Sequence, residues 1–195
     1  MKRIHLLLAM FIVLYAVTDV SADIPALAYK LKPRVVAEVR FWWSLDEPAS
    51  TFHAQIHQES LWNPEAESYA GAKGLAQFMP STADWISKLY PKALGENNPL
   101  DARWAIRALV IYDKWLYDRQ TMDDRWEGTL SSYNGGLGNL RKEQAKADNE
   151  GYNSRLWWDN VELVSCRPGW AFKENRGYVR RILKILKPFY EENGF

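Results

Sequence analysis

The sequence has very little cysteine and one sustained apolar run. Cys166 is the only cysteine among the 195 residues, so a monomer can form neither a disulfide nor a thiolate metal cluster. The apolar run at residues 6–17 is shorter than the roughly 20 residues that cross a bilayer as a helix. The sequence also lacks an alternating strand pattern of useful length and an internal repeat. Polytopic membrane and repeat architectures are therefore excluded, and the stability of the domain must come from packing.

An excess of charge of one sign is also lacking. Lys2, Arg3, the apolar run and the small residues at 20–22 resemble a secretory signal peptide, so we predict a signal peptide over residues 1–22. We expect export to the periplasm with cleavage before Asp23; an uncleaved inner-membrane anchor is the alternative. Removing Lys2, Arg3 and Asp19 from the 25 basic and 24 acidic residues leaves equal numbers of both. This balance gives no indication of nucleic-acid binding.

Apolar and aromatic side chains are abundant. Hydrophobic residues make up 47% and aromatic residues 14% of the chain, enough for the core of one domain. Their three- and four-residue spacings predict helices near residues 33–42, 51–62, 80–89, 102–116, 126–134 and 178–189. We also expect a polar helix at 141–147, a disturbed last turn at Pro188 and an aromatic-rich surface loop over 157–169, in which Trp157 and Trp158 fit either a sugar-binding cleft or the core. The pattern predicts a single domain that is either all-α or α+β and predominantly helical.

The helix predicted at 51–62 carries a glutamate on its apolar face. At about 100° per residue, Phe52, Ile56 and Glu59 project within roughly 60° of one another. Burial raises the pKa of a carboxyl group, and the negative end of the helix dipole acts in the same direction because Asn63 and Pro64 end the helix nearby. A carboxyl protonated near neutral pH suits general-acid cleavage of a glycosidic bond. The other interpretation is a core glutamate satisfied by hydrogen bonds, or one exposed at the helix end.

The residues after Glu59 form a pattern with two later motifs. The first motif is Glu59-Ser60-x-x-Asn63-Pro64, continued by Ala66, Ser68, Gly71-Ala72-x-Gly74-Leu75-x-Gln77 and Met79-Pro80-x-Thr82-Ala83. The later motifs are Tyr133-Asn134-Gly135-Gly136 and Glu174-Asn175-x-x-Tyr178-Val179. Together they resemble the signature of the soluble lytic transglycosylase family, which cleaves bacterial peptidoglycan. The resemblance implies a lysozyme-like fold, with an N-terminal helical extension at 23–50 and the transglycosylase domain at 51–195.

The resemblance implies that Glu59 is the single catalytic acid. The carboxyl would donate a proton to the oxygen between N-acetylmuramic acid and N-acetylglucosamine. It would then accept the proton of the muramyl C6 hydroxyl, whose oxygen attacks the anomeric carbon and closes a 1,6-anhydro ring. Such an internal nucleophile needs no second carboxylate. The nearest candidates for one, Glu65 and Glu67, follow the proline in a polar loop and are expected to be solvated.

The resemblance also implies a set of substrate-binding residues: Ser68, Gln77, Met79, Tyr133, Asn134, Glu174 and Tyr178. The Tyr133 phenol is a candidate to bond Glu59 or the developing charge, or a core aromatic with its hydroxyl at the rim. Glu174 resembles a residue that shapes the floor of the groove, and it equally fits a capping carboxylate at the start of the last helix. Tyr178 is most simply a packing residue.

The expected partner is the glycan strand of peptidoglycan, bound by a monomer that uses no cofactor and no metal. His53 and His57 are four residues apart, but Ala54 stands where a zinc-protease helix needs glutamate, and His57 points roughly 160° away from Glu59. Two other functions stay open at this point. One is a lysozyme-type muramidase that uses water, and the other is a weakly active peptidoglycan-binding subunit of a secretion, conjugation or phage apparatus.

Overall fold

Helices form almost all the regular structure of the protein, which a computed structural model describes over residues 23–195. The α-helices are α1 (Ala26–Trp42), α2 (Ser50–Ser60), α3 (Pro80–Leu89), α4 (Pro91–Leu94), α5 (Ala102–Tyr117), α6 (Arg125–Gly135), α7 (Leu137–Asn149), α8 (Gly169–Arg181) and α9 (Lys187–Glu192). A 3-10 turn, η1 (Val161–Leu163), and a π-helical segment, η2 (Ile182–Leu186), complete them. The predicted signal peptide at 1–22 lies outside the described residues.

The strand component of the predicted α+β fold is minimal. Two isolated β-bridges join Lys73 to Glu67 and to Phe78, and residues 23–195 contain no strand. The predominantly helical prediction is therefore confirmed, whereas the α+β label is not. No helix within the same range combines the length and the apolar character that crossing a membrane would require.

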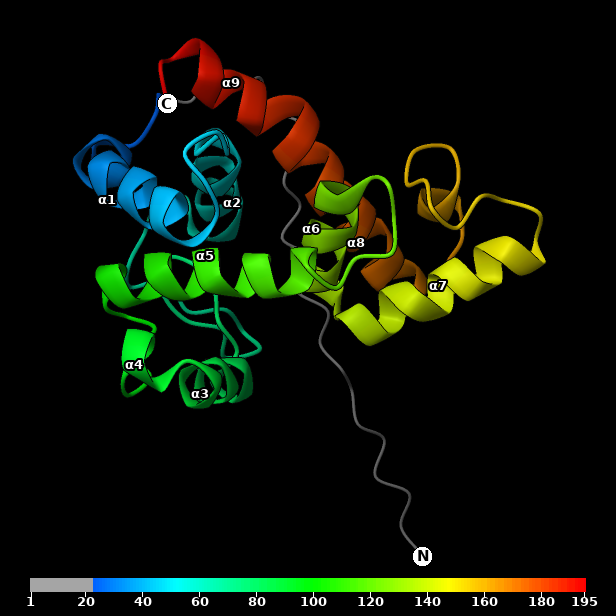
Figure 1. The fold of residues 1–195 in the computed structure, drawn as a ribbon, viewed down its shortest axis with the longest axis horizontal. Helices are drawn as coiled ribbons and strands as arrows, with labels where there is room; N and C mark the ends of the chain where they lie inside the picture. The colour runs from blue at the N-terminus through cyan, green and yellow to red at the C-terminus, as the bar shows by residue number, and fades with distance from the viewer. Residues whose placement is uncertain (1–22) are drawn as a thin grey trace, which may run out of the picture.

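Helix α5 crosses the middle of the molecule, with α1 and α2 above it and α3 and α4 below it in Figure 1. The Asp101 carboxylate caps its start by accepting a hydrogen bond from the backbone N–H of Trp104 at 2.7 Å. Ile106 and Leu109 are fully buried, as the helical spacing of the apolar residues predicts. The predicted helix at 102–116 is thus confirmed, and helices α1, α3, α4 and α6 pack against it.

The C-terminal helices form one long run over residues 169–192 that packs against α6 and α2 (Figure 1). Pro188 has no N–H to donate to the carbonyl of Lys184, and the run widens into η2 directly before α9. The disturbance predicted at Pro188 thus takes the form of a π-helical segment. Beyond α9, the Phe195 ring packs against Tyr29 of α1, with ring centroids 5.0 Å apart.

Two segments differ from the sequence prediction. Helix α1 begins at Ala26 and continues through Pro33, because packing on α5 holds the helix despite the lost hydrogen bond. The surface loop predicted at 157–169 is wrong for Trp157, which is fully buried. Its backbone N–H donates to the Asp124 carboxylate at 2.7 Å, and the Arg176 guanidinium lies 4.9 Å from its ring centroid. These contacts tie the segment to the domain.

The loop between α2 and α3 is held against the body of the domain by a glycine. Gly74 has φ +75°, and a Cβ placed there would lie 1.8 Å from the carbonyl oxygen of Pro99. Its backbone N–H donates to Ala66 O at 2.8 Å across the loop. Since only glycine tolerates both the left-handed conformation and this close approach, the loop takes one defined path beside Glu59.

Candidate active site

Helix α2 carries Glu59 in its last turn, and the helix ends in an uncommon conformation. Leu61 and Trp62 both have positive φ, at 52° and 63°, so two consecutive non-glycine residues turn the chain away from the helix axis. The Ser60 hydroxyl donates to Leu75 O at 2.9 Å, and the Trp62 indole N–H donates to the Tyr190 hydroxyl at 2.6 Å. These bonds fix the end of α2, and with it the Glu59 backbone.

The Glu59 side chain is only partly accessible to solvent. Burial raises the pKa of this carboxyl from 4.5 to about 8; the hydrogen bond from Tyr178 opposes the rise, and the negative charge of Glu174 adds to it. The Tyr178 hydroxyl donates to Glu59 Oε1 at 2.5 Å. The upward direction of the pKa is the one that the apolar helix face predicts. At pH 7 most molecules therefore carry a proton on Glu59.

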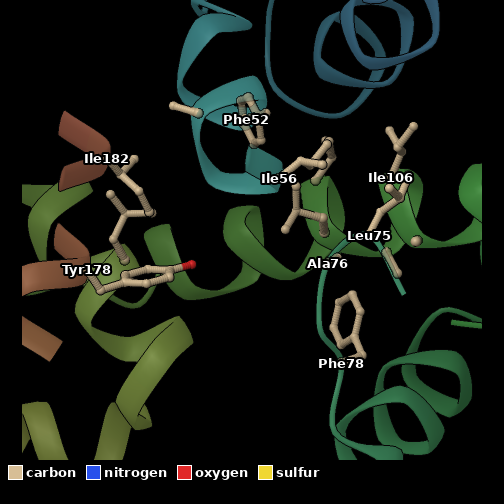
Figure 2. Close-up of a cluster of buried hydrophobic side chains, with 14 of the residues drawn as sticks. Phe52, Ile56, Leu75, Ala76, Phe78, Ile106, Tyr178 and Ile182 are labelled. Carbon is tan, nitrogen blue, oxygen red and sulfur yellow. The ribbon is translucent and has the colours of Figure 1, made fainter. Parts of the chain in front are cut away.

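The structure gives Tyr178, and not Tyr133, the hydrogen bond to Glu59. Tyr178 belongs to the buried cluster and points its hydroxyl from α8 into the space below α2, as Figure 2 shows. It therefore both packs and bonds Glu59, so the prediction of simple packing is incomplete. Tyr133 donates instead to the carbonyl oxygen of Ala76 at 2.7 Å, so the suggested bond to Glu59 is absent from the described residues. Burial raises the pKa of both phenols, and the charge of Glu59 adds to the effect.

Three predicted groove residues lie on the loop between α2 and α3. Gln77 adopts φ 48° and donates from its amide to Ala66 O and Gly74 O at 3.1 and 2.9 Å, so this amide nitrogen holds the loop together. The Ser68 hydroxyl accepts from the backbone N–H of Ala72 at 2.9 Å. Met79 is 41% exposed at the start of α3. Of the three, Met79 therefore presents the largest exposed side chain.

Asn134 and Glu174 meet across α6 and α8. The Asn134 amide donates to Glu174 Oε1 at 3.3 Å and accepts a hydrogen bond from the Asn175 amide at 2.9 Å. Glu174 is exposed and sits more than a turn inside α8, so the alternative role as a capping carboxylate at the helix start is wrong. It shares one face of the helix with Tyr178, four residues later. The second and third motifs therefore come together beside Glu59.

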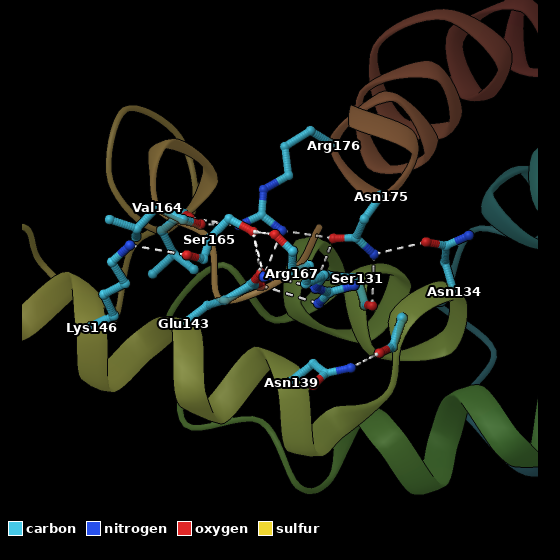
Figure 3. A network of polar contacts seen from close by, with 12 residues as sticks. Ser131, Asn134, Asn139, Glu143, Lys146, Val164, Ser165, Arg167, Asn175 and Arg176 are labelled. Carbon is cyan, nitrogen blue, oxygen red and sulfur yellow. Dashed lines mark hydrogen bonds and ion pairs between the residues drawn. The ribbon is translucent and has the colours of Figure 1, made fainter. Parts of the chain in front are cut away.

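A buried ionic network supports this arrangement from behind (Figure 3). Glu143 of α7 is fully buried and pairs with the guanidinium groups of Arg167 and Arg176, at 2.9 and 3.0 Å. Arg176 also donates to the side-chain oxygen of Asn175 at 2.9 Å. The orientation of Asn175, and through it that of Asn134, thus depends on a fully paired buried carboxylate.

The structure contains a buried carboxyl beside Glu59 that the sequence patterns could have revealed and that was not predicted. Glu65 and Glu67 are exposed, as predicted. Asp113 of α5, in contrast, is fully buried, and burial raises its pKa well above the ordinary value while the charge of Glu59 adds to the rise. Asp113 falls seven residues after Ile106 on the apolar face of α5. The same test that singles out Glu59, a carboxylate at an apolar helical position, would have found it.

The histidines of α2 pack on the far side from this site. His57 Nδ1 and the Tyr190 hydroxyl are 2.9 Å apart, and His53 Nδ1 lies 2.7 Å from Ala49 O. Burial lowers the pKa of both imidazoles from 6.5 to about 4, so they are neutral at pH 7. Within residues 23–195, no group of three or more histidine, cysteine or acidic side chains is placed to hold a metal ion.

An open pocket of about 320 Å³ lies between α3, α5 and the start of α7. Its lining combines aromatic rings and hydroxyls, from Ser81, Thr82, Trp85, Tyr112, Trp115 and Leu137. The rings of Tyr112 and Tyr133 are 5.3 Å apart between centroids, so the pocket adjoins the tyrosine that holds Ala76. Glu59 is not among the lining residues. Ring faces flanked by hydroxyls suit the binding of sugars.

Known proteins share this combination of fold and motifs. The sequence model of the family described as "Transglycosylase SLT domain" matches residues 45–156, more than half of the chain. The chain belongs to this transglycosylase family.

Two relatives show how much of the chain is shared. The chain is 33% identical over 131 residues to the membrane-bound lytic murein transglycosylase F of Pseudomonas syringae pv. tomato, a match that covers 64% of this chain and 24% of that protein. It is 33% identical over 138 residues to the soluble lytic murein transglycosylase of Escherichia coli K12, covering 70% and 20%. The chain thus spans about a quarter or less of the length of these curated relatives.

Solved structures agree on the fold. The 70-kDa soluble lytic transglycosylase of Escherichia coli superposes with a TM-score of 0.58 at 27% identity, over 80% of this chain and 24% of that one. The complex of the 70-kDa soluble lytic transglycosylase with bulgecin A gives a TM-score of 0.60 at 26% identity, over the same shares. Both matches are to proteins whose names describe lytic transglycosylases.

Proposed function

We propose that the protein is a peptidoglycan lytic transglycosylase in which Glu59 acts first as acid and then as base. Glu59 donates its proton to the oxygen between N-acetylmuramic acid and N-acetylglucosamine as the bond from that oxygen to the muramyl anomeric carbon breaks. The resulting carboxylate then takes the proton of the muramyl C6 hydroxyl. The C6 oxygen bonds to the anomeric carbon, and the product carries a 1,6-anhydro ring without the consumption of water.

The observation that carries this proposal is the state of the Glu59 carboxyl. It is partly accessible, it lies within the segment that matches the family, and burial raises its pKa to about 8. A general acid needs a proton at working pH and a pKa close enough to that pH to lose it. Glu59 meets both requirements.

Tyr178 stabilises the carboxylate between the two proton transfers. Its hydroxyl donates to Oε1, which leaves Oε2 of the protonated acid as the oxygen that carries the proton. A hydrogen bond to a charged oxygen is roughly twice as strong as one to a neutral oxygen. The contact therefore strengthens when Glu59 loses its proton, which lowers the barrier to acid catalysis.

The carboxyls of Glu65, Glu67 and Asp113 are unsuited to act as a second catalytic group, which favours the internal nucleophile over water. Hydrolytic glycosidases that use two carboxylates keep both of them at the scissile bond. Glu65 and Glu67 are exposed on the loop, and the buried Asp113 has no solvent-accessible surface through which to contact a sugar or an attacking water. The nearest functional alternative, a muramidase that uses water, would therefore have to take Glu174 as its base, and this exposed carboxyl accepts a hydrogen bond from Asn134 and acts electrostatically on Glu59.

Digestion of purified sacculi followed by mass spectrometry tests the proposal. We expect the protein to release anhydro-muropeptides, the Glu59→Gln variant to release none while it still binds sacculi, and the control Glu65→Gln to behave as the unmodified protein. Products with reducing ends alone would establish the hydrolase instead. Full biological function of the Glu59→Gln variant would favour the binding subunit of a larger apparatus.

We further propose roles for the remaining groove residues and for the setting of the enzyme. Ser68, Gln77, Met79, Tyr133, Asn134 and Glu174 would contact the glycan strand. We also propose the division into a signal peptide at 1–22, a helical extension at 23–50 and a catalytic domain at 51–195; the family match at residues 45–156 falls mostly within the last of these. Export to the periplasm follows from the first 22 residues, and peptidoglycan is the partner.

A further inference from the structure

A buried carboxyl and a buried amide face each other one turn below the catalytic glutamate. Asp113 of α5 and Gln55 of α2 are both fully buried, and the Gln55 amide donates to Asp113 Oδ1 at 3.4 Å. Asp113 Oδ2 and Gln55 Oε1 are buried and have no hydrogen-bond partner. Two unpaired buried acceptors are expensive, because each loses its water without a replacement donor.

A single proton on Asp113 Oδ2 would give both unpaired oxygens a hydrogen-bond partner. If Asp113 Oδ2 carries hydrogen, it can donate to Gln55 Oε1 while Gln55 Nε2 donates to Asp113 Oδ1, which closes a ring of two hydrogen bonds between an acid and an amide. An ionised Asp113 offers no such donor. None of the ion pairs found in residues 23–195 includes Asp113, so a negative charge there would also lack a cation.

The titratable groups that face Asp113 from the elements packed against it bring no positive charge to its carboxylate. Glu59 approaches from α2, Tyr133 from α6 and Tyr178 from α8, and Tyr112 precedes it on α5; each interacts with it electrostatically. All of these are acids. Burial raises the pKa of Asp113 well above its ordinary value, and the Gln55 hydrogen bond opposes that rise.

We propose that Asp113 and Gln55 form a neutral acid–amide pair that positions the last turn of α2, and so Glu59, over α5. Gln55 and Glu59 are one turn apart on one face of α2, so fixing the amide orients that turn. The neutral state of Asp113 also leaves Glu59 as the carboxyl that cycles between charged and uncharged forms. Asp113 is a positioning residue in this arrangement, since its buried side chain touches no substrate.

Infrared spectroscopy tests the protonation state without any assay of activity. At pH 7 the Glu59→Gln variant should retain the C=O stretch of a protonated carboxyl, and the Glu59→Gln/Asp113→Asn double variant should lose it. The difference spectrum assigns the band to Asp113. A Glu59→Gln protein without such a band has an ionised Asp113, which would overturn the proposal.

Kinetics test the positioning role, which deepens the proposed function and rests on it. Asparagine at 113 can make the same two hydrogen bonds with Gln55, so Asp113→Asn should keep the wild-type kcat and pH profile. Asp113→Leu removes both bonds and should lower kcat roughly 10- to 100-fold with a smaller effect on KM, as misplaced catalytic groups do. If the Asn variant loses activity or shifts the pH profile, Asp113 acts through a charge or a mobile proton, and the proposal fails.

A paired replacement keeps the test decisive if Asp113→Leu does not fold. Gln55→Leu/Asp113→Leu leaves no unpaired buried group, and such double replacements can be nearly neutral for stability. A folded double variant should show the same loss of kcat, whereas wild-type kcat would refute positioning. If every active variant releases products with reducing ends, the proposed function fails while the infrared result on Asp113 still stands.

Discussion

Replacing Glu59 by glutamine should stabilise the folded protein, and the gain should grow as the pH rises. The folded state holds the Glu59 proton with a pKa of about 8, whereas the unfolded chain holds it at the ordinary value of 4.5. The stability that this protonated carboxyl contributes is therefore complete below about pH 4.5 and is lost as the pH rises to about 8. Glutamine has the shape of the protonated acid and escapes this loss.

The size of the effect follows from the two pKa values. At about 1.36 kcal/mol for each pKa unit, the difference between the folded and unfolded pKa values of Glu59 corresponds to a change in unfolding free energy of at most roughly 5 kcal/mol. Partial exposure of Glu59 lets solvent screen the charged form, so we expect the gap between variant and wild type to widen by about 2–3 kcal/mol between pH 5 and pH 8. That range is large against the total stability of a domain of this size.

Urea unfolding monitored by tryptophan fluorescence at several pH values measures the gap directly. Other titrating groups, among them His53 and His57, contribute equally to both proteins and cancel in the difference. The Glu65→Gln control, at an exposed position, should show a flat difference over the same range. Parallel stability curves for wild type and Glu59→Gln would refute the protonated carboxyl on which the proposed function depends.

Three further predictions concern rate and stability. Tyr178→Phe should lower the rate of anhydro-muropeptide release roughly 10- to 100-fold, because a hydrogen bond to a charged group contributes about 1.5–3 kcal/mol. The same substitution should move the alkaline limb of the pH–rate profile to higher pH, because the lost hydrogen bond lowers the pKa of Glu59. Gly74→Ala should cost about 3 kcal/mol or more of unfolding free energy, since it adds a backbone collision to a left-handed φ. Glu143→Gln should cost about 3–5 kcal/mol, since two buried guanidinium groups lose their carboxylate.

Matched variants separate these effects from general damage. Tyr190→Phe removes a buried hydroxyl on the far side of α2, so it should lower stability without moving the pH limb. Gly71→Ala has a similar φ of +85° and open space around the added Cβ, so it should cost only about 1 kcal/mol. Equal losses for the two glycine variants in urea unfolding would contradict the collision at Gly74. Glu150→Gln, in an exposed pair with Lys146, should change stability by less than about 0.5 kcal/mol.

Sequence patterns predicted those parts of the molecule that depend on neighbouring residues. Helical spacing located α5, and Asn134 to Gly136 marked the end of α6, because side-chain direction repeats along a helix whatever packs on it. The same period placed Glu59 on the apolar face of α2 and predicted the direction of its pKa. Spacing could not show that α1 extends back to Ala26 or that Trp157 is buried, since both depend on what covers them.

Partners that are distant in sequence were decided by the tertiary structure. Tyr178 bonds Glu59 from 119 residues away while Tyr133 turns to Ala76, and Gln55 meets Asp113 across 58 residues. Which hydroxyl or amide reaches a given carboxyl depends on how α2, α5, α6 and α8 cross, and a periodic pattern on one helix carries no information about that crossing. By itself the sequence determined that the carboxyl at position 59 lies on an apolar helix face. The packing of the helices decided which groups form a hydrogen bond with this carboxyl and which charges act on it.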